Sequence, residues 1–437
     1  MSQPQAAIAA DALRLMRDTF AADPTAKLVQ NAVTTTTVTA VALNRDVVQT
    51  MDPLVSDRLD VWPATAQEKS GRCWLFAGLN LLRARLIADL KLETFEFSQN
   101  YLHFWDKLEK ANWFFTEMIA LADRPLDDRT IATLTRDPIG DGGQWDMFVA
   151  LVEKYGLVPK YAMPETQSSS DTKAMNRSLA TLLRRGARDL RAAGDQAEAV
   201  RQQLMLEVYR VLAIHLGTPP ERFTWAYRNK DKAYTRVGEL TPLEFARQIA
   251  PDLDDIVCLV NDPRHPYGVT MTVDHLGNVV GGRPIKYLNV AADKLKALVV
   301  TGISAGRPVW FGCDVMPQFD KDRGLWDQHL LDFEAVYGVD LTLTKAERME
   351  LGEEAMNHAM LFTGVDLVDG APRRFRVENS WGDEHGDKGF MTMNESWFAE
   401  HVFEVAVPVG DLTPDLVAAL DTEPIHLPLW DPMGTLA

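Results

Sequence analysis

The chain has 437 residues, 46% hydrophobic and 24% charged, which is enough to bury one large core or two. Its 45 Lys and Arg residues and 62 Asp and Glu residues give a formal charge of −17, which argues against a nucleic-acid surface spread over the whole protein. No run of about 18 apolar, uncharged residues occurs, so no segment is predicted to span a membrane.

The first sixty residues are predicted to form a helix and then an extended segment. Residues 6–22 have the pattern of an amphipathic helix, and their charged side chains exclude the apolar core of a secretion signal. Residues 33–39 read VTTTTVT, and such β-branched side chains favour extended structure. The whole chain contains three cysteines and no CxxC motif, which predicts reduced thiols in a cytoplasm: Cys73, Cys258 and Cys313.

Residues 67–80, QEKSGRCWLFAGLN, place a cysteine at the start of a helical pattern. Ser70 is predicted to cap this helix, in which leucines recur at helical spacing. Cys73 would then face unpaired backbone N–H groups and the positive end of the helix dipole, and both lower a thiol pKa. Gln67 offers an uncharged amide donor that suits an oxyanion hole. A single cysteine is more often an inert core thiol, so the prediction of a nucleophile depends on the rest of the chain.

Helical patterns dominate the next part of the chain. Residues 98–121 are rich in aromatic side chains and are predicted to form a helix packed on the core. Gly142 and Gly143 precede a helix that runs to Tyr155, and paired glycines allow another backbone to approach closely, although an ordinary turn is the alternative.

The following segment combines a linker, long helices and a hairpin. Residues 168–171 are predicted as a linker, 175–217 as strongly helical and 223–237 as a hairpin. Thr241 begins a capping box with proline at the first helical position, which predicts a helix to about Ile249.

From residue 256 onward the pattern is mainly that of strands. His358 opens the apolar run HAMLFTGV, and Asn379 ends the run RFRVEN. In a cysteine hydrolase a histidine takes the thiol proton and later protonates the leaving amine. An asparagine oxygen can fix the imidazole tautomer, and an aromatic ring such as Trp381 can shield that hydrogen bond from water. The order Gln67, Cys73, His358, Asn379 therefore predicts a thiol hydrolase.

Two other readings of the sequence are weaker. Residues 302–306 match the G-x-S-x-G motif of serine hydrolases around Ser304, but a predicted helix precedes the serine and a strand follows, which reverses the required order. His265 and His275 lie outside any metal-binding spacing, so no metal or other cofactor is expected.

The motifs SGRCW, NHAM and ENSWG around these residues resemble the papain superfamily of cysteine peptidases, and within it the bleomycin hydrolase family, whose bacterial members are called aminopeptidase C. The similarity runs from about Asp46 to the last residue. Ser70 and Arg72 depart from the papain-type signature, which has a cysteine and a small residue there. The interval from Cys73 to His358 is 285 positions (358 − 73), against roughly 130–150 in papain, so about half of it must be insertion.

The resemblance implies an α+β, papain-like, two-lobed fold, with a helical lobe, a β-barrel-like lobe and helical insertions. The expected units are an N-terminal helix and extended segment (1–60), a helical catalytic lobe with the nucleophile (61–170), a helical insertion (171–255), a β-rich catalytic lobe with a second insertion at about 316–356 (256–420), and a C-terminal arm in the active-site cleft (421–437).

The same resemblance implies a cytoplasmic cysteine aminopeptidase acting on peptides with a free N-terminus, with bleomycin-like amides as a further substrate class. It assigns main-chain substrate contacts to Gly142 and Gly143, and a contact with the substrate's ammonium group to the carboxylate of Ala437. It also implies a barrel-like homohexamer with the active sites facing an inner chamber. The alternative is a family member that keeps the catalytic residues but acts as a scaffold or nucleic-acid-binding protein.

Overall fold

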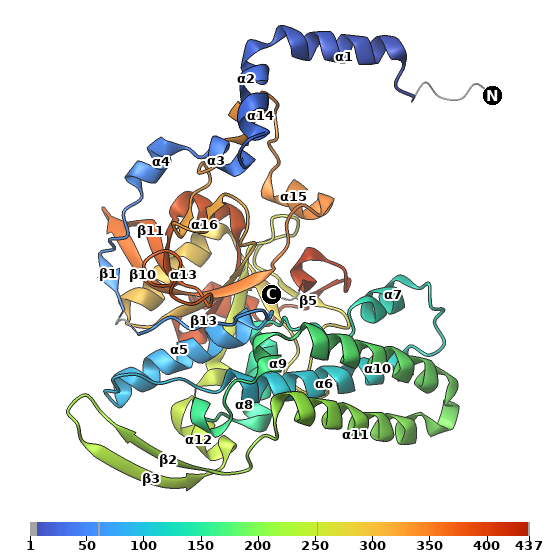
Figure 1. Cartoon of the computed structure of the whole chain (residues 1–437). Coiled ribbons are helices and arrows are strands. Elements are labelled where there is room, and N and C mark those ends of the chain that lie inside the picture. The colour runs from blue at the N-terminus through green and yellow to red at the C-terminus, as the bar shows by residue number, and fades with distance from the viewer. Residues whose placement is uncertain (1–6, 60–61, 251, 436–437) are drawn as a thin grey trace.

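The computed structural model describes residues 7–59, 62–250 and 252–435, and it divides into a helical part and a part built on one large sheet (Figure 1). The helices up to residue 250 are α1 Ala10–Ala22, α2 Pro24–Val33, α3 Val38–Ala42, α4 Arg45–Thr50, α5 Cys73–Asp89, α6 Gln99–Ala120, α7 Arg129–Arg136, α8 Trp145–Tyr155, α9 Gln167–Ser170, α10 Lys173–Ala192, α11 Ala197–Leu216 and α12 Pro242–Ile249. The later helices are α13 Ala292–Ser304, α14 Phe333–Tyr337, α15 Lys345–Leu351, α16 Glu395–His401 and α17 Pro414–Ala419.

Twelve of the described strands form one sheet, in the order β14-β5-β6-β4-β13-β7-β10-β11-β12-β9-β8, with β1 paired to β10. Its strands are β1 Asp57–Arg58, β4 Ile256–Val260, β5 Thr270–Val273, β6 Tyr287–Asn289, β7 Val309–Cys313, β8 Phe319–Asp320, β9 Leu325–Trp326, β10 His358–Val368, β11 Ala371–Glu378, β12 Phe390–Asn394, β13 Val402–Pro408 and β14 Ile425–Leu427. A separate hairpin joins β2 Phe223–Arg228 to β3 Tyr234–Leu240. The predicted α+β fold, with a helical and a β-rich part, is confirmed.

Two apolar cores support these parts. The larger one fills the helical part and includes side chains of α5, α6 and α8 such as Trp74, Phe104 and Phe148. The second lies on the sheet and includes Phe311 of β7 and Phe362 of β10, whose rings stack with centroids 3.9 Å apart. Helix α5 packs against β10, so the start of this helix is held at the boundary between the two cores.

Several helix boundaries follow from local capping chemistry. Helix α6 begins after Ser98, whose hydroxyl accepts from the Tyr101 N–H at 3.0 Å. Helix α12 begins with the predicted capping box, in which Thr241 and Glu244 satisfy each other's backbone N–H groups. In contrast, the prediction of extended structure for residues 33–39 is wrong, because Thr37 caps α3 through the Ala40 N–H.

Two further predictions differ from the structure. Residues 168–171 form most of α9 and its end instead of a linker, because Thr166 and Ser169 make a capping box there. Ser70 does not cap α5; the N-cap residue is Arg72, without a side-chain cap.

Helices α1 and α2 project from the body, and α1 has no buried residue (Figure 1). Within the described ranges, every helix is too short or too polar to cross a membrane.

Candidate active site

Cys73 is the first residue of α5, and its side chain is buried with 1% exposure. The leucines that follow at helical spacing are also buried, so the helix is held in the core and its first turn is fixed at the interface with β10. Burial raises the pKa of the Cys73 thiol, and the backbone N–H of Ala359, the second residue of β10, opposes this rise from within hydrogen-bonding reach. The nucleophile predicted from the sequence is therefore brought beside the strand that begins with His358.

His358 and Asn379 meet because β10 and β11 are antiparallel neighbours. The register pairs Leu361 with Glu378, which places Asn379 opposite Met360, two residues from His358 on the same face of the strand. The distance from His358 Nε2 to Asn379 Oδ1 is 3.0 Å. Since Asn379 Oδ1 also accepts from the Ser380 N–H at 2.7 Å, it is the acceptor in both bonds. His358 then carries its proton on Nε2, and Nδ1 is left to take a proton.

Trp381 lies beside this pair, with its ring centroid 5.0 Å from that of His358. The indole is half-buried, and Lys321 Nζ lies 5.0 Å from its centroid. The ring thus lies close to the bond between His358 and Asn379, and its role in limiting the access of water to that bond stays a prediction.

Gln67 is held at both ends of its side-chain amide. Its Oε1 accepts from the Ser380 hydroxyl at 2.6 Å, and its Nε2 donates to the Ser70 carbonyl. The backbone N–H of Gln67 also donates to the Ser380 carbonyl at 2.8 Å. Because the amide has two N–H groups and the Ser70 carbonyl accepts from one, the second has a fixed direction, and it has no acceptor among the residues that the structure describes.

Ser380 is a site residue that sequence reasoning missed. It lies between Asn379 and Trp381 in the motif ENSWG, so its position in the chain was the available signal. Its contact with Gln67 spans 313 positions and could not be read from local pattern.

The pKa of Cys73 differs from the sequence-based expectation. Burial raises it to about 11, although the backbone N–H groups of Ala359, Trp74 and Cys73 act in the opposite direction. Burial also lowers the pKa of His358 to about 4, against a smaller raising effect of the bond to Asn379. Desolvation disfavours the charged form of each group, so it outweighs the helix N-terminus and favours a neutral thiol beside a neutral imidazole.

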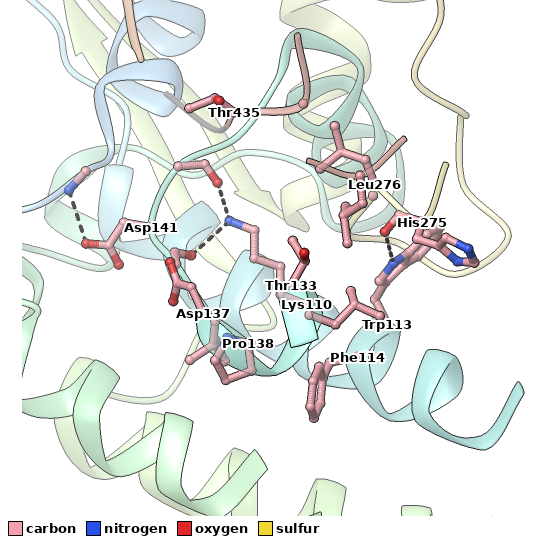
Figure 2. A pocket seen from close by; sticks show the side chains of 18 of the residues that line it. Lys110, Trp113, Phe114, Thr133, Asp137, Pro138, Asp141, His275, Leu276 and Thr435 are labelled. Carbon is pink, nitrogen blue, oxygen red and sulfur yellow. Dashed lines mark hydrogen bonds between the residues drawn. The ribbon is translucent and has the colours of Figure 1, made fainter. Parts of the chain in front are cut away.

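A cavity of about 660 Å³ adjoins the site and is lined by Gly71, Gly142, Asn357 and Thr435, among others (Figure 2). The predicted position of Gly142 on the cleft is consistent with this lining. Its carbonyl accepts from Lys110 Nζ at 2.5 Å, and Lys110 is a buried residue that the sequence did not single out.

Gly143 has a packing role. A Cβ at this position would come within 2.4 Å of the Trp74 ring, so a side chain there would displace the indole next to Cys73. Trp74 in turn donates from Nε1 to the Asp141 carbonyl at 2.8 Å.

The C-terminal segment reaches the same cavity. Met433 is fully buried, and the Thr435 carbonyl accepts from Gln144 Nε2 at 2.9 Å. Residue 435 also lines the cavity together with Asn357, the neighbour of His358. The predicted role of Ala437 lies outside the described residues.

The G-x-S-x-G motif around Ser304 and the histidines His265 and His275 do not form catalytic or metal sites among the described residues. Ser304 is the last residue of α13, and the strand β7 follows it, so the strand–serine–helix order of a serine hydrolase is not met. His275 is paired with Glu117 at 2.7 Å, and His265 lies 3.9 Å from Asp262. Among the described residues, no three side chains of the metal-binding types gather as ligands would.

A buried thiol at the N-terminus of a helix that packs on β10, together with the imidazole that begins β10 and its asparagine partner, is the side-chain set of a papain-type thiol hydrolase. The family model described as "Peptidase C1-like family" matches residues 7–434. The chain belongs to this family, and the prediction of a papain-type cysteine peptidase is confirmed.

Individual relatives are similar over nearly the whole chain. Bleomycin hydrolase of Homo sapiens is 44% identical over 434 residues, which cover 95% of each chain. Aminopeptidase C of Lactococcus lactis subsp. lactis is 41% identical over 438 residues, covering 98% of this chain and all of the relative. The crystal structure of pepw from Lactobacillus rhamnosis superimposes with a TM-score of 0.97 at 42% identity, covering 99% of this chain and 100% of the other.

Proposed function

We propose that this protein is a cysteine aminopeptidase that releases N-terminal residues from peptides. The observation that carries the proposal is the joint geometry of Cys73 at the start of α5 and the bonded pair of His358 and Asn379. The relatives named bleomycin hydrolase and aminopeptidase C support the choice of substrate class.

In the proposed mechanism, Cys73 Sγ attacks the first peptide carbonyl as His358 Nδ1 takes the thiol proton. Because burial favours the neutral pair, this proton transfer accompanies the attack. The negative oxygen that forms is stabilised by the free N–H of Gln67 Nε2 and by the Cys73 backbone N–H. The amine then leaves with the proton from His358, and a thioester remains on Cys73.

Water completes the cycle in the same site. His358 removes a proton from the water as its oxygen attacks the thioester carbonyl, and the tetrahedral intermediate collapses to a carboxylic acid. The thiolate that leaves takes back the proton from His358. Asn379 keeps the imidazole in one tautomer through both halves of the reaction.

The substrate's main chain is proposed to run along Gly142, which lines the cavity, and past Gly143. The C-terminal segment is proposed to close one end of the cleft, because Thr435 lines the same cavity. A closed end would leave room for a single residue before the scissile bond, with its ammonium near the carboxylate of Ala437. Bleomycin-like amides are proposed as a second substrate class from the names of the relatives alone.

We also propose a cytoplasmic homohexamer. Three buried free cysteines support a reducing compartment. Helix α1 projects from the body (Figure 1). It exposes the apolar side chains Leu13, Leu15, Met16 and Phe20, which contact with other subunits would cover. The molar mass in solution, measured by light scattering, tests the hexamer.

The activity is tested with a pair of fluorogenic aminoacyl amides, one with a free N-terminus and one acetylated. The parent should hydrolyse the free amide and refuse the blocked one. Cys73→Ala should lower hydrolysis by about a thousandfold or more while the protein stays folded. Cys258→Ala, a control at another buried cysteine, should remain active. A folded parent without amidase activity would favour the scaffold or nucleic-acid-binding alternative.

A further inference from the structure

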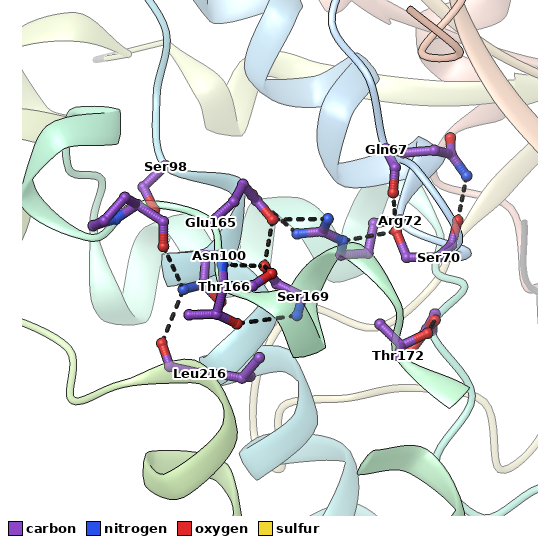
Figure 3. A network of polar contacts seen from close by, with 12 residues as sticks. Gln67, Ser70, Arg72, Ser98, Asn100, Glu165, Thr166, Ser169, Thr172 and Leu216 are labelled. Carbon is purple, nitrogen blue, oxygen red and sulfur yellow. Dashed lines mark hydrogen bonds and ion pairs between the residues drawn. The ribbon is translucent and has the colours of Figure 1, made fainter. Parts of the chain in front are cut away.

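Arg72, the residue directly before Cys73, is fully buried and forms an ion pair with Glu165 (Figure 3). Its Nη1 donates to Glu165 Oε1 at 3.1 Å, and Nη2 lies 3.0 Å from Oε2. The guanidinium also lies 5.1 Å from the centroid of the Phe76 ring, one turn into α5. Burying a charge is costly unless it is paired, so a cation at this position needs its carboxylate.

Glu165 is itself held in place by the helix α9. The Ser169 hydroxyl donates to Glu165 Oε2 at 2.5 Å, and Ser169 closes the capping box with Thr166. The Thr166 hydroxyl donates to the His215 carbonyl at 3.0 Å, which ties this turn to the end of α11. The carboxylate that Arg72 meets is therefore part of a fixed framework.

The other side of Arg72 leads to the amide of Gln67. Arg72 Nε donates to the Ser70 hydroxyl at 2.9 Å, and that hydroxyl donates to the Gln67 carbonyl at 2.6 Å. The Ser70 carbonyl in turn accepts from Gln67 Nε2. A continuous set of polar contacts thus runs from Glu165 through Arg72 and Ser70 to the oxyanion donor (Figure 3).

The backbone supplies a second, separate attachment of the same loop. The Lys69 N–H donates to the Ser170 carbonyl at 2.9 Å. This bond fixes the path of the loop at Lys69, whereas the guanidinium fixes Ser70 and the orientation of the Gln67 side chain. A planar guanidinium suits that task because its N–H groups point in fixed directions toward both Glu165 and Ser70.

We propose that Arg72 and Glu165 are positioning residues that hold the Gln67 amide, through Ser70, in the orientation that stabilises the oxyanion. The inference rests on the proposed function, because it takes Gln67 as the oxyanion donor and Cys73 as the nucleophile. Neither Arg72 nor Glu165 contacts the reacting atoms.

The test uses Glu165→Gln in the full-length enzyme, with Asp252→Asn as the matched control. Asp252 forms an ion pair at 3.0 Å with Arg85, which lies on the same helix α5 as Cys73. That pair is exposed and lies near the C-terminal end of the helix. Glu165→Gln should lower kcat about 10- to 100-fold with little change in KM, since a misplaced donor weakens the transition state. Asp252→Asn should leave kcat unchanged.

A second measurement separates positioning from a general effect on the nucleophile. A thiol attacks a saturated carbon of iodoacetamide, and this reaction forms no oxyanion. Iodoacetamide should therefore alkylate Cys73 of the Glu165→Gln variant at a rate within about twofold of that of the parent. In a Gln67→Ala background, Glu165→Gln should cause no further loss of kcat, because the two residues act as a unit. Arg72→Lys keeps the charge without the planar guanidinium and should show the same loss of kcat. This variant replaces Glu165→Gln in the test if Glu165→Gln fails to fold.

The inference is overturned if both Glu165→Gln and Arg72→Lys keep the kcat of the parent, or if alkylation of Cys73 slows in parallel with hydrolysis. It is also overturned if the loss of kcat caused by Glu165→Gln multiplies with the loss caused by Gln67→Ala in the double variant. Failure of the proposed function would look different, since hydrolysis would then be absent in the parent or would survive Cys73→Ala.

Discussion

The Ser380 hydroxyl donates to Gln67 Oε1 at 2.6 Å, and the Ser380 backbone N–H donates to Asn379 Oδ1 at 2.7 Å. One residue therefore orients both the amide of the proposed oxyanion hole and the asparagine that holds His358. Because both bonds come from one residue, the positions of the oxyanion donor and of the base are coupled through Ser380.

Ser380→Ala should lower kcat by about tenfold, less than the 10²–10³ expected when an oxyanion donor itself is removed. Without the hydroxyl, Gln67 Oε1 loses its donor and the amide can rotate, while the backbone bond to Asn379 remains. Steady-state hydrolysis of a free aminoacyl amide measures the effect. Ser178→Ala, at an exposed position of α10, serves as the control. A kcat equal to that of the parent would show that Ser70 alone orients the amide.

Local chemistry explains which elements the sequence predicted well. The helix Pro242–Ile249 and its capping box were predicted to within a residue, because the signal lies within four positions. The order of Gln67, Cys73, His358 and Asn379 was informative since each residue adjoins a strong helix or strand pattern. The roles assigned to these residues stay predictions until the variants are measured.

Long-range contacts explain what the sequence did not predict. The threonines of residues 33–39 were expected to extend the chain, but Thr37 caps a helix instead, a choice that β propensity does not address. The chain from residue 256 onward was expected to form mainly strands, but residues 277–281, GNVVG, form none, and the short strand β6 Tyr287–Asn289 pairs with β4. The ion pair of Arg72 and Glu165 spans 93 positions and had no local signature.

The acid limb of kcat/KM should lie near pH 4, well below the ordinary histidine pKa of about 6.5. Burial lowers the pKa of His358, so the imidazole stays neutral and able to accept a proton until the pH falls to about 4. The contribution of His358 to the free energy of unfolding also falls as the pH falls. The unfolded state binds more protons between about pH 6.5 and 4, so the contribution of His358 is present above pH 6.5 and is lost as the pH falls.

Initial rates between pH 3.5 and 8 measure this limb, with activity at pH 7 after each exposure as the control for unfolding. An acid limb near pH 6.5 would show that the imidazole is hydrated and would contradict its burial.

Glu404→Gln should stabilise the protein at alkaline pH. Glu404 lies on β13 with no exposed surface, and the side chain that faces its carboxylate is the Cys258 thiol, which is only a weak hydrogen-bond donor. Burial raises its pKa to about 8, so the folded state keeps a proton that the unfolded state releases above about pH 4.5. Stability is therefore lost as the pH rises from about 4.5 through 8, and the neutral amide removes that loss.

Thermal unfolding at pH 5.5 and pH 8.5 tests this sign. The melting temperature of Glu404→Gln relative to the parent should be higher at pH 8.5 than at pH 5.5. Glu353→Gln, at an exposed position, should show the same difference at both pH values. A relative melting temperature of Glu404→Gln that does not depend on pH would mean that Glu404 is ionised in the folded protein.

Deletion of Met433 to Ala437 should convert the proposed aminopeptidase into an enzyme that accepts blocked or internal peptide bonds. The segment is anchored before this point, because β14 pairs with β5 and Asp431 forms an ion pair with Arg264 at 2.8 Å. The deletion therefore removes Gly434 and Thr435 from the lining of the cavity and leaves Leu429 and the anchor in place.

The expected change in preference follows from the charge that the deletion removes. A carboxylate and an ammonium about 4 Å apart attract by up to ~4 kcal/mol at an effective dielectric near 20, before desolvation. A net coupling of about 1–3 kcal/mol corresponds to roughly a five- to hundredfold preference for a free N-terminus. The truncated enzyme should lose this factor in kcat/KM for short free substrates and gain hydrolysis of the acetylated amide. Arg129→Ala, which removes only the contact of the guanidinium with the Trp430 ring at 4.1 Å, should keep the parent's preference. If the truncated enzyme still refuses acetylated substrates, residues 433–437 do not set the specificity, and it comes from the rest of the cavity wall, which includes Leu429.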